Sequence, residues 1–162
     1  MARFDRRPAG IRARLEAREI LLLRELAREM RSLLEADAPR VDPVVARLFP
    51  DAYEDTRARA AYRDLVDADL RAAKLHAVAT VERGLEEPGG APVLDDADAE
   101  AWLTFANDVR LAIGTRLGVD EDAMATGVAP DDPDADAFHV LHWLAWVQES
   151  ILDAIGSADA DE

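Results

Sequence analysis

The stretch Ala101–Asp120, AWLTFANDVRLAIGTRLGVD, decides how the rest of the chain is arranged. Apolar residues recur along it at intervals of three and four positions: Trp102, Phe105, Val109, Ala112, Ile113 and Leu117. This spacing predicts a helix with one broad apolar face. We therefore expect this helix to organise the core, with the other helices packed around it.

The same helix carries a second, polar line through Asn107, Arg110 and Gly114, with Asp108 and Arg116 beside it. Polar groups on a buried helix must meet water, a partner side chain or a ligand. Two interpretations stay open. The polar groups fix the register against a tryptophan-rich helix near the C-terminus, with Asp108 and Arg110 in buried or interface pairs and Gly114 allowing close approach, or they form a ligand or partner site.

Apolar periodicity predicts four further helices, at residues 16–35, 43–48, 55–84 and 135–155. The Asp42-Pro43 pair is typical of a helix start, and Gly118 is expected to end the central helix that Asp95 begins. The helix over residues 55–84 is expected to bury a face that includes Leu65 and Val66, with a break considered near Val66.

Residues 1–15 show a different pattern. Ile11, Ala13 and Leu15 alternate with Arg12 and Arg14 after the turn residues Pro8-Ala9-Gly10, which predicts a small β-hairpin. The predicted fold is thus mainly α: a single-domain helical bundle of about five helices over residues 1–156, with the hairpin at residues 1–15. The acidic tail 157–162 is expected to be disordered.

Composition limits the classes of function. A net charge of −15 argues against a surface devoted to nucleic acid, and the absence of cysteine excludes a disulfide, a thiolate metal site or a thiol redox switch in these 162 residues. No signal peptide is recognisable, and no apolar run approaches the roughly 20 residues that span a bilayer. We expect a cytoplasmic protein that makes no membrane contact.

Charge is unevenly distributed, because residues 1–31 contain nine arginines and five acidic residues while the whole chain is strongly acidic. Such asymmetry is typical of an interaction arm, although an arginine-rich solvated helix face explains it as well. The candidate contacts for DNA phosphates or an acidic partner are Arg3, Arg6, Arg7, Arg12 and Arg14.

Catalytic and metal-binding patterns are weak. His139 and His142 lie three residues apart, with Glu149 further along the same predicted helix, but no third strong ligand can be assigned. The acidic run 131–134 lacks the spacing of a calcium loop, and neither a nucleophile elbow nor a phosphate-binding loop occurs. We predict no enzyme activity, no cofactor and no metal site. For Trp143 and Trp146 two interpretations stay open: they pack in the core, or they contact a partner protein.

Four segments of the chain match one family: Leu48–Tyr53 (LFPDAY), Asp67–Lys74 (DADLRAAK), Asn107–Gly118 (NDVRLAIGTRLG) and Trp143–Ser150 (WLAWVQES). Together they resemble the actinobacterial AosR-like family of oxidative-stress transcriptional regulators, formerly a family of unknown function. The last two segments are the most specific. They mark a signature for partner binding or structure: Asn107, Asp108, Arg110, Gly114, Arg116, Trp143, Trp146, Gln148 and Glu149.

The resemblance implies a non-enzymatic regulator that works through protein partners of the transcription machinery, with promoter DNA as a further candidate partner. The alternative it implies is an adaptor or scaffold linked to Clp-dependent proteolysis, and a homo-oligomer is compatible with either. Redox sensing in the family is understood to use a pair of cysteines. This chain departs from that pattern because it contains no cysteine.

Overall fold

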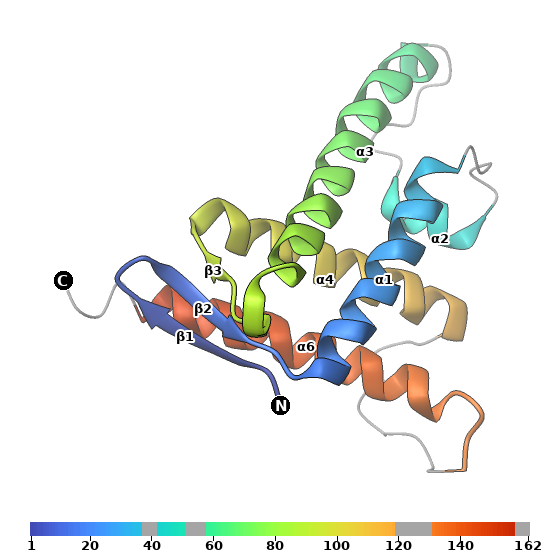
Figure 1. Ribbon diagram of the computed structural model, residues 1–162. Helices are drawn as coiled ribbons and strands as arrows, with labels where there is room; N and C mark the ends of the chain where they lie inside the picture. Colours follow the sequence, from blue (N-terminus) through green and yellow to red (C-terminus); the bar gives the residue numbers. More distant parts are fainter. Residues whose placement is uncertain (37–41, 51–57, 119–130, 158–162) are drawn as a thin grey trace.

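The computed structural model describes residues 1–36, 42–50, 58–118 and 131–157 (Figure 1). The described residues form five α-helices, a short 3-10 turn and one antiparallel sheet, which confirms the predicted fold class. The strands are β1 (Arg3–Arg7), β2 (Gly10–Arg14) and β3 (Val93–Leu94). The helices are α1 (Ala17–Glu35), α2 (Pro43–Leu48), α3 (Ala58–Leu85), α4 (Asp96–Leu117) and α6 (Ala135–Gly156).

Helix α4 lies at the centre of the described chain, because it packs against α2, α3, α6 and β3. Trp102, Phe105 and Val109 are buried along it, as the apolar periodicity predicts. Asp95 caps its first turn by accepting a hydrogen bond of 2.8 Å from the backbone N–H of Asp98. Gly118 ends it in the left-handed conformation, at φ 63°. The organising role expected of this stretch is confirmed.

Among the described residues, one ion pair is buried in the mainly apolar interior. Lys74 of α3 donates to Oδ1 of Asp108 on α4 at 2.6 Å, and the two residues are only 9% and 3% exposed. Burial raises the pKa of the Asp108 carboxyl, while the hydrogen bond and the charge of Lys74 act in the opposite direction. The ion pair therefore favours one register of α3 on α4, since sliding one helix along the other would leave a buried charge unpaired.

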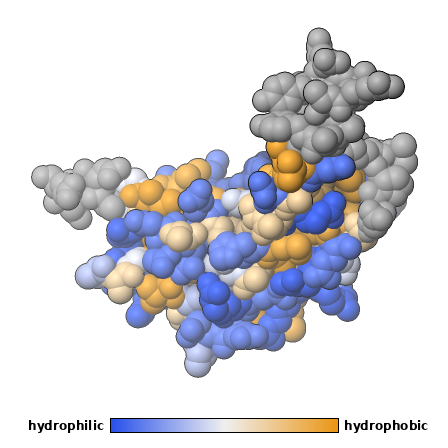
Figure 2. Space-filling model, turned by 90° about the horizontal axis from the view of Figure 1, so that it is seen from above, coloured by the Kyte–Doolittle hydropathy of each residue, from blue (hydrophilic) through white to orange (hydrophobic). Residues whose placement is uncertain are grey.

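Helix α3 runs without interruption through Val66, so the break considered there does not occur. Its N-terminal half projects away from the other described helices (Figure 1), and Leu65 and Val66 are 69% and 40% exposed. The prediction that these two side chains are buried is wrong, because no described element covers that part of the helix. Hydrophilic residues cover most of the face in Figure 2, and hydrophobic ones form small separate patches.

The predicted hairpin is confirmed, with Arg3 opposite Arg14 and Arg7 opposite Gly10. Strand β3 adds to β2, a pairing that the sequence pattern did not indicate. Gly10 has φ 138°, and a Cβ atom there would collide with the backbone oxygen of Leu94. Only glycine therefore lets β3 approach this end of the hairpin.

Two further contacts seat the hairpin on the helices. The ring of Phe4 meets Trp102 of α4 edge-on, with centroids 6.4 Å apart. The buried carboxylate of Glu19 on α1 accepts hydrogen bonds from the backbone N–H groups of Ala2, at 2.7 Å, and Glu16, at 2.8 Å. Strand β1 is consequently held at both its face and its beginning.

Three predicted segments fall partly or wholly outside the described residues. They are the family segment Leu48–Tyr53 beyond Pro50, the first residues of the helix expected at 55–84, and the tail after Ser157.

We predict that Lys74→Met destabilises the fold by about 3–5 kcal/mol at neutral pH, the usual cost of leaving one partner of a buried ion pair unpaired. Without Lys74 the pKa of Asp108 rises further, because both influences that lower it are removed. The folded state of the variant then binds the proton of Asp108 more tightly than the unfolded state does. The loss of unfolding free energy caused by Lys74→Met therefore becomes smaller as the pH falls through that raised pKa. Urea unfolding at several pH values between neutral and mildly acidic measures this change.

The double variant Lys74→Met/Asp108→Leu serves as the control, since it removes both charges and keeps apolar volume. Its stability is expected near that of the unmodified chain and without the added pH dependence. A single variant that unfolds like the unmodified chain at every pH contradicts the structural role of the pair.

We also predict that Gly10→Ala lowers the free energy of unfolding by more than about 2 kcal/mol. The substitution adds a collision with Leu94 to the strain of a positive φ. Gly89→Ala is the matched control. Gly89 also has a positive φ, 73°, but open space lies where its Cβ would be. We expect Gly89→Ala to lower the free energy of unfolding by about 1 kcal/mol. Equal losses of unfolding free energy in the two variants would show that the β3 contact does not require glycine at position 10.

Candidate functional site

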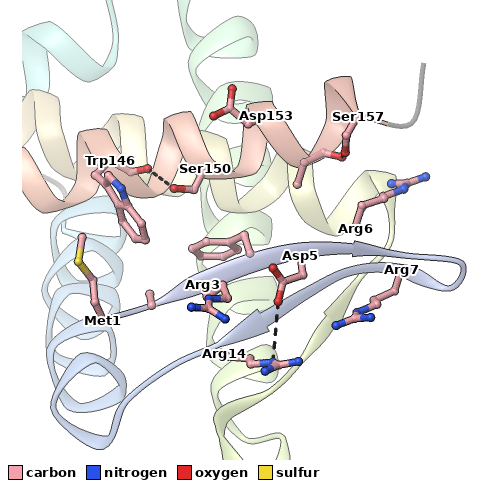
Figure 3. Close-up of a pocket in the computed structure, with 13 residues that line it drawn as sticks. Met1, Arg3, Asp5, Arg6, Arg7, Arg14, Trp146, Ser150, Asp153 and Ser157 are labelled. Carbon is pink, nitrogen blue, oxygen red and sulfur yellow. Dashed lines mark hydrogen bonds and ion pairs between the residues drawn. The ribbon is translucent and has the colours of Figure 1, made fainter. Parts of the chain in front are cut away.

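An open recess of about 840 Å³ lies between the hairpin and α6 (Figure 3). The hairpin contributes Met1, Ala2, all five residues of β1 and Arg14. Helix α6 contributes Trp146, Ser150, Asp153 and Ala154, and Ser157 lines the recess just after the helix ends. We call this hollow the hairpin recess. It brings four of the five arginines predicted as contacts, all except Arg12, into the same hollow as Trp146 from the opposite end of the chain.

Because side chains alternate along each strand, the arginines lie on different faces of the hairpin. Phe4, Ile11 and Ala13 are buried, and successive side chains of a strand point to opposite faces. Four arginines therefore share the exposed face of the hairpin: Arg3, Arg7, Arg12 and Arg14. Arg12 is on this face but does not line the recess, whereas Arg6 lines the recess from the other face.

The arginines are only lightly paired. Nε of Arg14 lies 3.9 Å from Oδ2 of Asp5, and NH1 of Arg6 lies 3.8 Å from Oδ1 of Asp96. Long ion pairs at the surface contribute little to stability. The exposed hairpin face thus presents four guanidinium groups against one carboxylate, Asp5, and its charge is available to an anionic partner.

Both tryptophans of α6 are half-buried and pack against the core, so part of each indole fills space there. Only Trp146 also lines the recess, where Figure 3 shows it pointing toward the hairpin. Ser150, one turn later, donates to the backbone oxygen of Trp146 at 2.8 Å and lines the same wall. Trp146 therefore combines packing against the core with a place in the wall of the recess, whereas Trp143 lies outside the recess.

The polar line of α4 joins helices together. Asp108 pairs with Lys74, and NH1 of Arg110 donates to Oε1 of Gln148 on α6 at 2.7 Å. Gln148 in turn lies 3.4 Å from the backbone oxygen of Leu103 through its Nε2. Among the described residues Nε of Arg110 is buried without a hydrogen-bond partner. This geometry matches the interpretation in which the polar groups fix the register of α4 against its neighbours.

The remaining signature residues do not join the recess. Asn107, Arg116 and Glu149 are exposed. Arg116 lines a separate hollow of about 460 Å³ against α1, with Glu25, Arg28, Glu29, Ser32 and Leu33. The expectation for Gly114 is wrong, since a Cβ there would have no atom within 4 Å. None of the described helices comes close to Gly114, and polar contacts join α4 to α6 elsewhere.

Sequence reasoning missed two residues that hold the site in place. Lys74 is the only lysine beside eighteen arginines, and that singularity was the one available signal for a buried role. Glu19 was given no role from the sequence, although it holds the start of β1. Its position three residues after Glu16 is the spacing of a capping box, which is present.

The described residues were also compared with the requirements of a metal site and of a membrane-spanning helix. His139, His142 and Glu149 are all exposed, and the described part of the chain contains no group of three His, Asp or Glu side chains that could hold a metal ion. None of the helices described is both long enough and apolar enough to cross a bilayer.

Comparison with known proteins identifies relatives. An AosR-named protein of Mycobacterium leprae is 33% identical over 128 residues, which is 70% of this chain and 58% of that protein. The oxidative stress regulator AosR of Mycobacterium tuberculosis is 30% identical over 125 residues, 68% of this chain and 57% of that protein. The chain thus spans less than three fifths of the length of these relatives. No solved structure matches.

The match to a family model is more extensive. The model described as "Domain of unknown function (DUF2017)" covers residues 1–155, which include the hairpin, every described helix and the whole of α4 with its polar line. The chain therefore belongs to the DUF2017 family.

Proposed function

We propose that this chain is a non-enzymatic cytoplasmic regulator that acts by binding another protein in the hairpin recess. The observation that carries the proposal is the meeting of several arginines with Trp146 along one open hollow. Arginine and tryptophan are enriched among the residues that dominate binding energy at protein interfaces. The names of the relatives, oxidative stress regulators, support the regulatory class.

The absence of cysteine shapes this proposal. A regulator that senses oxidants through its own thiols needs a cysteine to oxidise, and this chain has none. We therefore assign it the binding role alone, with any response to oxidants arising in the partner or in the amount of either protein.

DNA is the second candidate for the recess and the exposed hairpin face. Four arginines on one small surface can contact phosphates without reading sequence. Opposing this, Asp5 and Asp153 line the same recess, and the chain has a net charge of −15. The electrostatic balance therefore favours a protein partner.

The proposal predicts that Arg3→Ala/Arg7→Ala loses the partner that the unmodified chain retains in a crosslinked pull-down from the native cytoplasm, read by mass spectrometry. A matched control is Arg28→Ala/Arg47→Ala, which removes the same charge from exposed sites on α1 and α2. Recovery of that partner is expected to fall at least tenfold in the first variant and to stay within about twofold in the control. Equal recovery from both variants would contradict a partner site at the hairpin.

The identity of the partner separates the regulatory classes. Components of the transcription machinery support the leading proposal, whereas Clp components support the adaptor alternative. Promoter fragments test the DNA candidate at low salt. That candidate fails if the chain binds them no better than a protein of similar charge does.

A further inference from the structure

Strand β1 is an edge strand. The sheet order is β1-β2-β3, so β1 has a neighbour on one side only. An edge strand presents unpaired backbone N–H and C=O groups and is a template for pairing with another chain.

The hydrogen-bond pattern shows which groups are free. The N–H groups of Ala13 and Leu15 point away from β1, since they donate to the backbone oxygens of Pro92 at 2.9 Å and Gly90 at 2.8 Å. Antiparallel pairs alternate, so Arg3, Asp5 and Arg7 use their backbone groups on β2. The backbone groups of Phe4 and Arg6 therefore face the open edge. No hydrogen bond within the described residues reaches them there.

The hairpin recess runs along this edge. All five residues of β1 line it, from both faces of the strand, whereas β2 contributes Arg14 alone. Figure 3 shows the strand and α6 as the two walls of the hollow. A recess that follows one free strand edge fits an extended peptide better than a compact ligand.

Side chains around the edge define the chemistry of the occupant. An added strand would alternate its own side chains between the two faces of the sheet. On the exposed face they would meet Arg3, Arg7 and Arg14 beside the single carboxylate of Asp5. On the inner face they would meet Trp146 and Ala154, with Arg6 and Asp153 also lining the recess. Acidic residues complement the first set and apolar residues the second.

We propose that β1 binds an extended partner segment of alternating acidic and apolar residues, which adds a fourth strand to the sheet within the hairpin recess. This inference rests on the proposed function, because it specifies how the same site holds a protein partner. The peptide backbone pairs with Phe4 and Arg6, and its carboxylates pair with the arginines.

The probe is the capped synthetic peptide Asp-Val-Asp-Val-Asp-Val, labelled at one end and titrated by fluorescence anisotropy up to millimolar concentration. The matched peptide with lysine in place of aspartate tests the charge requirement, and a single-stranded oligonucleotide and a DNA duplex test the nucleic-acid alternative. We expect saturable binding of the acidic peptide, at least tenfold weaker binding of the lysine peptide, and weakening of the acidic complex by salt.

Amide hydrogen exchange followed by NMR reads the backbone pairing directly in the unmodified chain. Without peptide, the N–H groups of Arg3, Asp5 and Arg7 are expected to exchange slowly and those of Phe4 and Arg6 quickly. With the acidic peptide at saturation, exchange at Phe4 and Arg6 is expected to slow at least tenfold. Binding without that protection would overturn strand addition.

Two substitutions at one position separate backbone from side chain. Arg6→Pro removes the edge-facing N–H but spares the groups that pair with β2, and proline is tolerated at strand edges. Arg6→Ala removes the same side chain and keeps the N–H. We expect Arg6→Pro to bind the peptide at least tenfold more weakly than Arg6→Ala does. The circular dichroism spectra of the two variants are expected to be the same. Equal affinity for the peptide in the two variants contradicts the proposal.

The outcomes also separate this inference from the proposed function. If the acidic peptide fails to bind while the cellular partner is still lost in Arg3→Ala/Arg7→Ala, the partner site stands and strand addition is wrong. Preferential binding of either DNA, with no protection at Phe4 and Arg6, overturns both.

Discussion

The buried pair of Lys74 and Asp108 is the constraint on which the helical arrangement depends. A carboxylate on an apolar helix is costly unless a partner meets it at hydrogen-bond distance, and here the partner comes from α3. The position of α3 on α4 is thereby specified more tightly than apolar packing alone would require. Arg110 and Gln148 specify α6 on α4 in the same way, with less burial. The central helix is consequently held by a polar contact to each of these two neighbours.

The hairpin recess depends on that framework. Phe4 packs on Trp102 of α4, Glu19 of α1 holds the backbone of Ala2, and α6 supplies the opposite wall. Groups that must act together in binding are most effective when rigid elements fix them, because less ordering remains to be done on association. For the proposed partner, the recess therefore provides a preorganised strand edge next to the indole of Trp146. Its arginines can attract an anionic segment even though the chain as a whole is acidic.

The 162 residues contain no cysteine, so the proposed binding site does not depend on a thiol. The contacts that shape the fold and the recess involve carboxylates, guanidinium groups, one ammonium group and aromatic rings, none of which needs a thiol. The fold is thus compatible with a regulator whose partner recognition does not change with the oxidation state of the chain.

Much of the secondary structure could be predicted because its causes are local. The spacing of apolar residues predicted α1, α4 and α6, and the capping residues predicted the ends of α4. The alternation of apolar and charged residues predicted the hairpin. The tertiary structure alone decided which groups meet, since the paired residues Lys74 and Asp108 are 34 positions apart and Arg110 and Gln148 are 38 apart. It also left Leu65 exposed, placed Gly114 against open space and brought Trp146 to the hairpin. Local pattern records which face of an element is apolar, but only packing between distant elements determines what that face meets.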